Sequence, residues 1–302
     1  MRNGSPPSRT KTSDLTICPT SASTAAAASA AVRVESESSS TSISSPRSRS
    51  RSATFAAVGC TGLSYSPAVA LLEVDSVTKR FGGIVALDRV SFDVGAGEIV
   101  GLIGPNGAGK TTAFNVITRI YTPDSGDVRL DGESLLRTRP GAVVKRGVAR
   151  TFQNVELFRG LTVFENVQVG AHARQGEHTV DDAIYYLGLA SLRNRPVASL
   201  SYGTQKRVEL ARALASSPRV VLLDEPAGGL SHEEVQDLAT LLGQLRTDFE
   251  VTVLLVEHHM GLVMSVADRV HVLDFGRKIA EGTPAEVQKN PAVIEAYLGT
   301  AA

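Results

Sequence analysis

The chain of 302 residues lacks several features that would assign it to a specialised class of protein. Its two cysteines, Cys18 and Cys60, form neither a disulfide framework nor a Cys-x-x-Cys metal or redox pair. It has no run of 18 or more apolar residues, the length that a membrane-spanning helix requires. Lys+Arg and Asp+Glu both number 31, and this balance argues against a basic protein with nucleic acid as its partner. A hydrophobic content of 42% remains, which is enough for a sizeable core.

The first 70 residues differ in composition from the rest of the chain. They contain 18 serines and 12 alanines, and their seven basic and three acidic residues give a net charge of +4. They have two aromatic residues and no apolar period, so they cannot bury enough surface to offset the entropy of ordering. We therefore expect a disordered tail over 1–70. The Arg-Ser run at 47–52 resembles an RS-type RNA-binding tract, and the alternative is a solvated basic tail. For the tail as a whole, a transit peptide or a start-site artefact stays open.

From Leu71 onward, short apolar segments alternate with segments of helical period. The expected strands are Leu71–Val77, Ser91–Val94, Glu98–Ile103, Asp127–Leu130, Arg219–Leu223, Val251–Val256 and Val270–Asp274. The expected helices are Lys110–Ile120, Leu161–Ala173, Asp181–Leu189, Gly203–Ala215, 231–247, Ala285–Val287 and Val293–Leu298. This alternation predicts an α/β fold with a largely parallel sheet.

A glycine-rich loop follows the expected strand at 98–103 and matches the phosphate-binding pattern G-x-x-x-x-G-K-[ST]. Glycines allow backbone N–H groups to turn towards phosphates, and the following helix adds its positive N-terminal end. Lys110 is expected to reach the β- and γ-phosphates, and the Thr111 hydroxyl to bind Mg²⁺. The expected phosphate site comprises Gly104, Pro105, Asn106, Gly107, Ala108, Gly109, Lys110, Thr111 and Thr112.

A second motif places two carboxylates at the end of a buried strand, in the sequence Val220-Val221-Leu222-Leu223-Asp224-Glu225. The carboxyl end of a strand in an open sheet lies at the ligand crevice. Asp224 is therefore a candidate Mg²⁺ ligand, and Glu225 is suited to accept a proton from a water that attacks the γ-phosphate.

The order of further motifs resembles that of ABC-type ATPases. The phosphate loop is followed by a glutamine, Gln153, then by Leu200-Ser201-Tyr202-Gly203, then by Asp224-Glu225, and finally by His258 after the next strand. The resemblance covers about residues 71–299. It implies a P-loop NTPase fold with a RecA-like core, an antiparallel β subdomain, and a small helical subdomain at about 154–202.

The resemblance also assigns roles to residues that the spacing alone leaves open. It makes Gln153 a ligand to Mg²⁺ and to the attacking water, and His258 a contact to the γ-phosphate. Phe81 is expected to stack on the adenine. Ser201 and Gly203 correspond to the signature segment that faces the γ-phosphate held by a second subunit. The alternative for Ser201 is a helix N-cap.

Several stretches narrow the resemblance to the ATP-binding subunits of branched-chain amino-acid importers. They include Arg80–Gly83, Phe114–Thr118, Arg150–Asn154, Glu257-His258 and Gly282–Pro284. The resemblance implies ATP hydrolysis at the cytoplasmic face of the membrane. The implied partners are permease subunits, a second ATP-binding subunit that is identical or paralogous, and an extracytoplasmic solute-binding protein. Phe158 and Leu161, which follow Gln153, are expected to line a groove for a permease helix.

Three other functions compete with this interpretation. The first is an importer of urea, amides or another small solute, because the ATP-binding subunit does not touch the transported molecule. The second is a soluble ABC ATPase of repair or translation, but the chain has neither a coiled-coil or zinc insertion nor a second ATP-binding domain. The third is a P-loop kinase, which would lack the Leu200–Gly203 segment.

Overall fold

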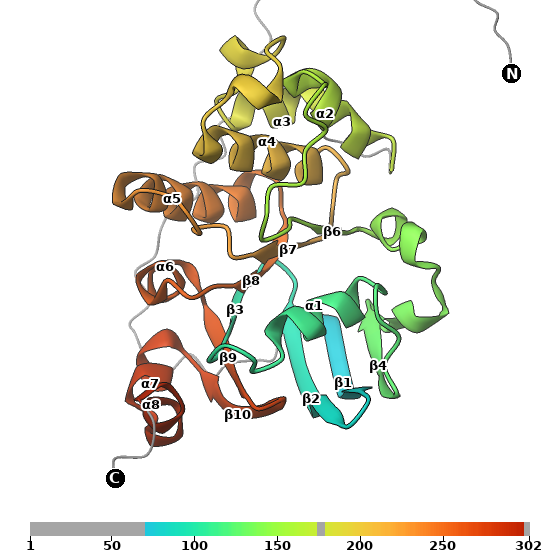
Figure 1. Cartoon of the computed structure of the whole chain (residues 1–302), viewed down its shortest axis with the longest axis vertical. Coiled ribbons are helices and arrows are strands. Elements are labelled where there is room, and N and C mark those ends of the chain that lie inside the picture. Colours follow the sequence, from blue (N-terminus) through green and yellow to red (C-terminus); the bar gives the residue numbers. More distant parts are fainter. Residues whose placement is uncertain (1–69, 174–178, 299–302) are drawn as a thin grey trace, which may run out of the picture. The chain divides into compact units, whose positions relative to one another are not determined.

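The computed structural model describes residues 70–173 and 179–298, so the tail expected over 1–70 lies, except for Ala70, outside the described residues. The described residues form two β-sheets and a set of helices that cover them (Figure 1).

The strands are β1 (Ala70–Phe81), β2 (Ile84–Gly95), β3 (Ile99–Ile103), β4 (Ser125–Leu130), β5 (Glu133–Ser134), β6 (Val148–Arg150), β7 (Val220–Asp224), β8 (Thr252–Val256), β9 (Arg269–Asp274) and β10 (Arg277–Gly282). The α-helices are α1 (Lys110–Ile117), α2 (Val163–Ala171), α3 (Val180–Tyr186), α4 (Tyr202–Leu214), α5 (His232–Asp248), α6 (Met260–Val266), α7 (Pro284–Lys289) and α8 (Pro291–Leu298). Short 3₁₀ helices lie at Leu135–Arg137, Pro140–Ala142, Val144–Arg146, Ala190–Leu192 and Val197–Ser199.

The larger sheet has the strand order β10-β9-β3-β8-β7-β6, and all of its pairs are parallel except β9–β10. Its central strands are buried on both faces, as their continuous apolar sequences predict. In β7, Val220 and Leu222 pack on the side of α1, while Val221 and Leu223 pack on the side of α4 and α5. The predicted α/β fold with a largely parallel sheet is confirmed.

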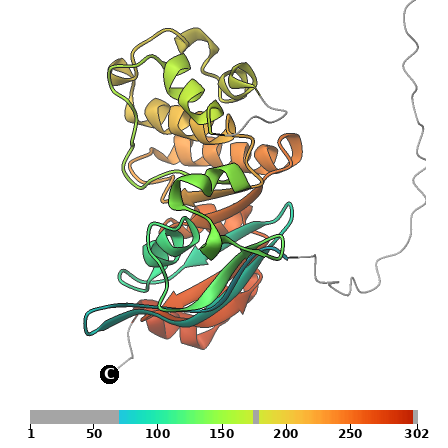
Figure 2. The ribbon, with the colours of Figure 1, turned by 90° about the vertical axis from the view of Figure 1, so that its right-hand side faces the viewer.

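The smaller sheet, in the order β2-β1-β4-β5, is antiparallel. Helix α1 packs between the two sheets (Figures 1 and 2). Its Phe114 and Ile117 are fully buried and lie in one cluster with residues of β1, β2, β7 and β8. The phosphate loop that precedes α1 is therefore anchored to both sheets. The turn between β4 and β5 consists of Asp131 and Gly132, both at positive φ, which is the sequence and conformation typical of a two-residue hairpin.

Helices α2, α3 and α4 form the helical part that Figure 1 shows above the sheets. Gly170 of α2 faces the backbone of Arg212 in α4, where a Cβ atom would overlap the Arg212 carbonyl oxygen. The close approach of α2 and α4 therefore depends on this glycine. Helices α2 and α3 lie within the range 154–202 predicted for the helical subdomain, and α4 begins at its end.

Some expected elements have different bounds in the structure. Helix α1 ends at Ile117 instead of Ile120, because Arg119 takes a left-handed backbone conformation with φ +63° and Ile120 turns towards solvent. Helices α2 and α3 start after Thr162 and Thr179, each of which forms a capping box with an acidic residue three positions later.

Other elements were missing from the expectation. Strands β1 and β2 extend as a long hairpin beyond their predicted apolar cores, and β6, β10 and α6 were not predicted. In the described part of the chain, no helix combines the length and the apolar character that a membrane span needs.

Candidate functional site: a phosphate loop facing a held carboxylate

The phosphate loop runs from the end of β3 to the start of α1, which is the context that its sequence predicted. Two of its glycines are required by close backbone contacts. A Cβ atom on Gly104, whose φ is +151°, would overlap the carbonyl oxygen of Leu273. A Cβ atom on Gly109, the left-handed N-cap of α1, would lie 2.5 Å from the carbonyl oxygen of Ala86. Only glycine, which lacks a Cβ atom, can adopt these positive φ values and also allow these close backbone contacts.

The Lys110 ammonium lies inside the curve of this loop. Its Nζ donates hydrogen bonds to the carbonyl oxygens of Gly104 at 2.7 Å and Pro105 at 2.9 Å. Burial lowers the pKa of Lys110, and the nearby carboxylates of Glu225 and Asp224 act in the opposite direction. The cation predicted to contact phosphates is thus held at the loop and faces the two carboxylates of the second motif.

Glu225 directly follows β7 and has a left-handed backbone conformation with φ +49°. This conformation is uncommon for a residue with a side chain, and the surrounding structure must maintain it. The Glu225 amide donates to the carbonyl oxygen of Val256 at 2.8 Å, and its carbonyl oxygen accepts from Lys206 Nζ at 2.9 Å. Two hydrogen bonds from other segments therefore hold the Glu225 backbone in this conformation.

Both carboxylate oxygens of Glu225 are held by residues from other segments. His258 Nε2 lies 2.7 Å from Oε1, and the Gln153 amide nitrogen donates to Oε2 at 2.8 Å. The structure therefore brings together all three residues that were predicted to be catalytic. They come from three separate places, after β6, β7 and β8, at the carboxyl edge of the parallel strands.

Glu257 appeared in the sequence only as part of the Glu257-His258 stretch and had no predicted role, but the structure gives its carboxylate three backbone partners. Its carboxylate is buried and accepts hydrogen bonds from the backbone amides of Ala227 at 2.6 Å, His258 at 2.9 Å and His259 at 3.0 Å. It ties the loop after Glu225 to the loop that carries His258. A carboxylate directly after a buried strand was the sequence signal, as it was for Asp224.

The predicted metal residues Thr111, Asp224 and Gln153 offer a hydroxyl, a carboxylate and an amide. These hard oxygen donors suit Mg²⁺, which keeps several waters and takes few protein ligands. Asp224 is 3% exposed and adjoins Lys110, which also fits a site for a metal-bound triphosphate. Arg150, which had no predicted role, donates from Nη2 to Asp224 Oδ2 at 2.7 Å.

Three predicted nucleotide contacts lie apart from this cluster. Phe81 ends β1, is 40% exposed, and packs edge-to-face on Tyr121 with the ring centroids 5.1 Å apart. Ser201 caps α4 and accepts from the Thr204 amide at 3.3 Å, so the capping role is observed. Within the described ranges, no hydrogen bond joins Ser201 or Gly203 to the phosphate loop.

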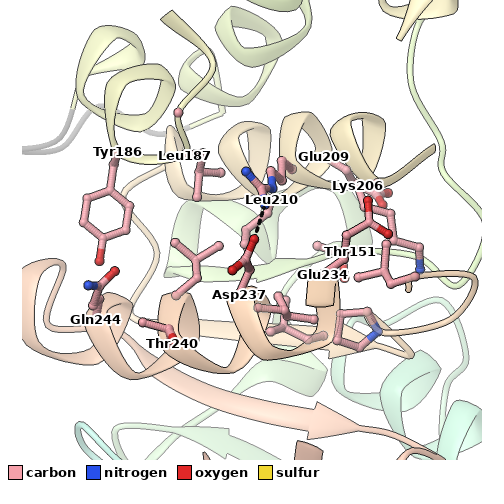
Figure 3. A pocket seen from close by; sticks show the side chains of 18 of the residues that line it. Thr151, Tyr186, Leu187, Lys206, Glu209, Leu210, Glu234, Asp237, Thr240 and Gln244 are labelled. Carbon is pink, nitrogen blue, oxygen red and sulfur yellow. Dashed lines mark hydrogen bonds and ion pairs between the residues drawn. The ribbon is translucent and has the colours of Figure 1, made fainter. Parts of the chain in front are cut away.

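A cavity of about 320 Å³ lies between α4 and α5, with the end of α3 at one side (Figure 3). Tyr186 and Gln244 lie at one end, and Lys206, which contacts Glu225, lies at the other. An ion pair between Arg207 and Asp237 spans the space between the two helices at 3.3 Å. No residue of the loop 104–111 lines this cavity, so it adjoins the candidate site without being part of the phosphate pocket.

Comparison with known proteins defines the class. A family model described as "ABC transporter" matches residues 87–228, and one described as "Branched-chain amino acid ATP-binding cassette transporter" matches residues 277–302. The chain belongs to the ATP-binding subunits of ABC transporters, a family of ATP hydrolases.

Two relatives show which members of this family it resembles. The chain is 42% identical over 251 residues to the high-affinity branched-chain amino acid transport ATP-binding protein BraF of Pseudomonas aeruginosa, a match that covers 76% of this chain and 98% of BraF. It is 41% identical to LivG of Escherichia coli, a protein with the same description, at the same coverage.

Solved structures agree with this assignment. A nucleotide-free ATP-binding cassette of an ABC transporter superposes with a TM-score of 0.69 at 30% identity, and the match covers 76% of this chain and 99% of that one. A bacterial ABC transporter cassette solved as a dimer superposes with a TM-score of 0.64 at 28% identity, over 70% of this chain and 98% of that one. The predicted P-loop NTPase fold is confirmed.

Proposed function

We propose that this chain binds and hydrolyses Mg²⁺-ATP to drive an importer of branched-chain amino acids. The observation that supports ATP hydrolysis is the Glu225 carboxylate, whose two oxygens are held by His258 and Gln153. The similarity to BraF and LivG and the match over 277–302 support the choice of transported solute.

The phosphate loop binds the triphosphate. Its backbone amides and the N-terminal end of α1 offer hydrogen bonds and a positive field to the phosphate oxygens. The Lys110 ammonium exchanges its contacts with Gly104 and Pro105 for the β- and γ-phosphates, and it stabilises the charge that develops there. Phe81, at the exposed end of β1, stacks on the adenine.

Glu225 acts as the general base for the attacking water. Its carboxylate accepts the proton as the water oxygen attacks the γ-phosphorus and the bond to the leaving ADP oxygen breaks. Gln153 and His258 hold the two carboxylate oxygens and so fix the orientation of the base. Their remaining polar atoms are available for the water and the γ-phosphate.

Thr111, Asp224 and Gln153 would hold Mg²⁺, which supplies charge neutralisation for the β- and γ-phosphate oxygens when it is bound. The protein ligands offered to Mg²⁺ are oxygen atoms only. Among the described residues, no cluster of three or more His, Cys, Asp or Glu side chains forms a separate all-protein metal cage.

The proposal includes three kinds of partner: a second ATP-binding subunit, permease subunits and a solute-binding protein. A second ATP-binding subunit, identical or paralogous, places its Ser201–Gly203 segment over the nucleotide of this one. Permease subunits dock at the cytoplasmic face of the membrane, and an extracytoplasmic protein delivers the solute to them.

A groove of about 700 Å³ offers a surface for the permease. Phe158 and Phe152 line it together with residues before β6 and on α2 and α4, and both rings are exposed, by 52% and 37%. Leu161, the other residue expected there, is partly buried and is not among the lining residues. The groove begins next to Gln153, which contacts the catalytic base.

Solute uptake by a Pseudomonas aeruginosa strain without BraF tests the proposed function. Expression of this chain should restore accumulation of labelled leucine, isoleucine and valine, while the Lys110→Ala variant should not. Uptake of labelled urea and acetamide is measured alongside, because a small-solute importer is the competing proposal. Restored urea uptake without leucine uptake would reject the branched-chain assignment.

A further inference from the structure

The guanidinium of Arg150 occupies a buried junction of three structural elements. Arg150 ends β6 and is only 7% exposed as a side chain, while its partner Asp224 on β7 is 4% exposed. Nη2 donates to Asp224 Oδ2 at 2.7 Å, and Nη1 donates to the amide oxygen of Asn115 on α1 at 2.6 Å. One planar cation thus joins β6, β7 and the helix that follows the phosphate loop.

Two aromatic rings complete the surroundings of this guanidinium. Its central carbon lies 5.4 Å from the ring centroid of Phe114 and 5.1 Å from that of Phe152. A planar, permanently charged group can use its edges for hydrogen bonds and its faces for rings at the same time. A lysine ammonium at position 150 could keep the charge but not this set of contacts.

Asp224 depends on a partner because it is buried. A carboxylate taken out of water without a counter-charge is strongly destabilised, and Arg150 supplies that charge in a hydrogen-bonded geometry. Carboxylates that bind metals are in turn held by outer hydrogen bonds that fix their orientation. The contact uses one oxygen of Asp224, and a carboxylate has two.

We propose that Arg150 is the positioning residue for Asp224, holding Oδ2 so that the other carboxylate oxygen is presented to the Mg²⁺ of bound nucleotide. This inference rests on the proposed metal role of Asp224. Asn115 holds the other terminal nitrogen of the guanidinium, Nη1, so the group stays in place and supports the carboxylate when the metal binds.

The same guanidinium lines the groove of Phe158, together with Phe152. The Arg150 side chain therefore links the proposed permease groove, which it lines, to the proposed metal ligand Asp224, with which it pairs. A displacement of Phe152 would reach Asp224 through one ring contact and one ion pair.

The test is the Mg²⁺ dependence of binding of a non-hydrolysable ATP analogue to the purified full chain, measured by calorimetry. Arg150→Met should raise the Mg²⁺ concentration for half-maximal enhancement of binding by about tenfold or more. Its affinity for the analogue in EDTA should stay within about twofold of the parent chain, because Arg150 does not contact the phosphate loop. Arg150→Lys should recover part of the Mg²⁺ dependence.

Two further variants keep the test decisive. Arg146→Met removes an exposed arginine that pairs with Glu133 and should change nothing. If Arg150→Met does not fold, Asn115→Ala removes the anchor while leaving the ion pair, and it should shift the Mg²⁺ midpoint in the same direction by a smaller factor. An unchanged or lower midpoint in every folded variant at positions 150 and 115 would overturn the inference.

Asp224→Asn separates this inference from the proposed function. It should raise the midpoint at least as much as Arg150→Met, and the double variant should be no weaker than Asp224→Asn alone, because both changes act on one group. If Asp224→Asn shifts the midpoint and Arg150→Met does not, only the positioning role fails. If Asp224→Asn leaves the midpoint unchanged, the metal role of Asp224 is wrong, and the role of Arg150 falls with it.

Discussion

His258 and Glu225 are in direct contact, with the imidazole Nε2 2.7 Å from the carboxylate Oε1. Glu225 follows β7 and His258 follows the neighbouring parallel strand β8. They meet because both strands end at the same edge of the sheet. The Gln153 amide on the opposite oxygen makes the carboxylate a group held from two sides. Such holding keeps a general base in one orientation, which is the geometric requirement for proton transfer.

The first prediction concerns Glu225 as the proposed general base. Glu225→Gln should bind ATP as the parent chain does and should lose about 10²- to 10⁴-fold in hydrolysis, the usual contribution of a general base. The substitution keeps the size of the side chain but removes its ability to accept the proton. Steady-state phosphate release and ATP binding on the purified protein measure the two effects. Glu295→Gln, an exposed change on α8, is the matched control. Hydrolysis within a few-fold of the parent rate would contradict the assignment.

The relation between sequence and structure differs from one part of this site to another. The phosphate loop was predicted from sequence because its residues are contiguous and each has a local reason to be there. Arg150 was not, because its role comes from the register of β6 against β7, in which Arg150 pairs with Leu222 and so lies beside Asp224 two residues further on. Arg150 and Asp224 are 74 positions apart in the chain, so no local sequence pattern indicates that they are in contact.

Two strands were not predicted, because their conformation depends on pairing with adjacent strands and their own sequences have no apolar period. The three-residue β6 is too short for any period, and β10 has the charged sequence Arg-Lys-Ile-Ala-Glu-Gly. Arg269 and Lys278 both pair with Glu281, so ion pairs accompany the antiparallel β9–β10 ladder where apolar alternation is absent. Apolar alternation is the signal that sequence reasoning uses, and here it was missing.

The second prediction concerns the stability of the phosphate loop. Gly104→Ala should lower the free energy of unfolding by more than about 3 kcal/mol, beyond the range of most single substitutions, because its Cβ would overlap the Leu273 carbonyl oxygen. Gly107→Ala is the control within the same loop. Its φ is +82° and its Cβ would meet nothing within 4 Å, so only the left-handed backbone cost of about 1–2 kcal/mol applies. Denaturant unfolding without nucleotide measures both, and equal losses would refute the packing argument.

The third prediction concerns coupling through the groove. Phe158→Ala should leave the ATPase of the isolated subunit within about twofold of the parent rate and should reduce solute transport by the assembled transporter. The reason is that the Phe158 ring lies exposed in the groove, whereas its backbone is held by Asn166. ATPase assays on the free subunit and uptake into proteoliposomes with the permease supply the two measurements.

The control for this coupling experiment is Tyr185→Ala. Tyr185 is 80% exposed on α3 and does not line the groove, so transport should be unaffected by its loss. If Phe158→Ala lowers the melting temperature and the basal ATPase together, the ring serves internal packing and the docking role is wrong.

The last prediction is that each ATP site is completed by the Ser201 segment of a second subunit. Within the described chain, Ser201 caps its own helix and makes no hydrogen bond to the phosphate loop that holds Lys110. An exposed helix N-terminus can still bind the phosphate of another subunit, and ATP then supplies the contacts that close the dimer. Lys110→Ala and Ser201→Arg should each abolish hydrolysis in a homodimer, the first by removing the phosphate contact and the second by blocking the signature. Mixed dimers contain one site with both residues intact, so ATPase activity should partly return when the two variants are combined. Subunit exchange is verified by energy transfer between labelled copies, and a mixture of two chains that both carry Lys110→Ala gives the background. Proven exchange without any recovery would contradict a site shared between identical subunits and would favour a paralogous partner.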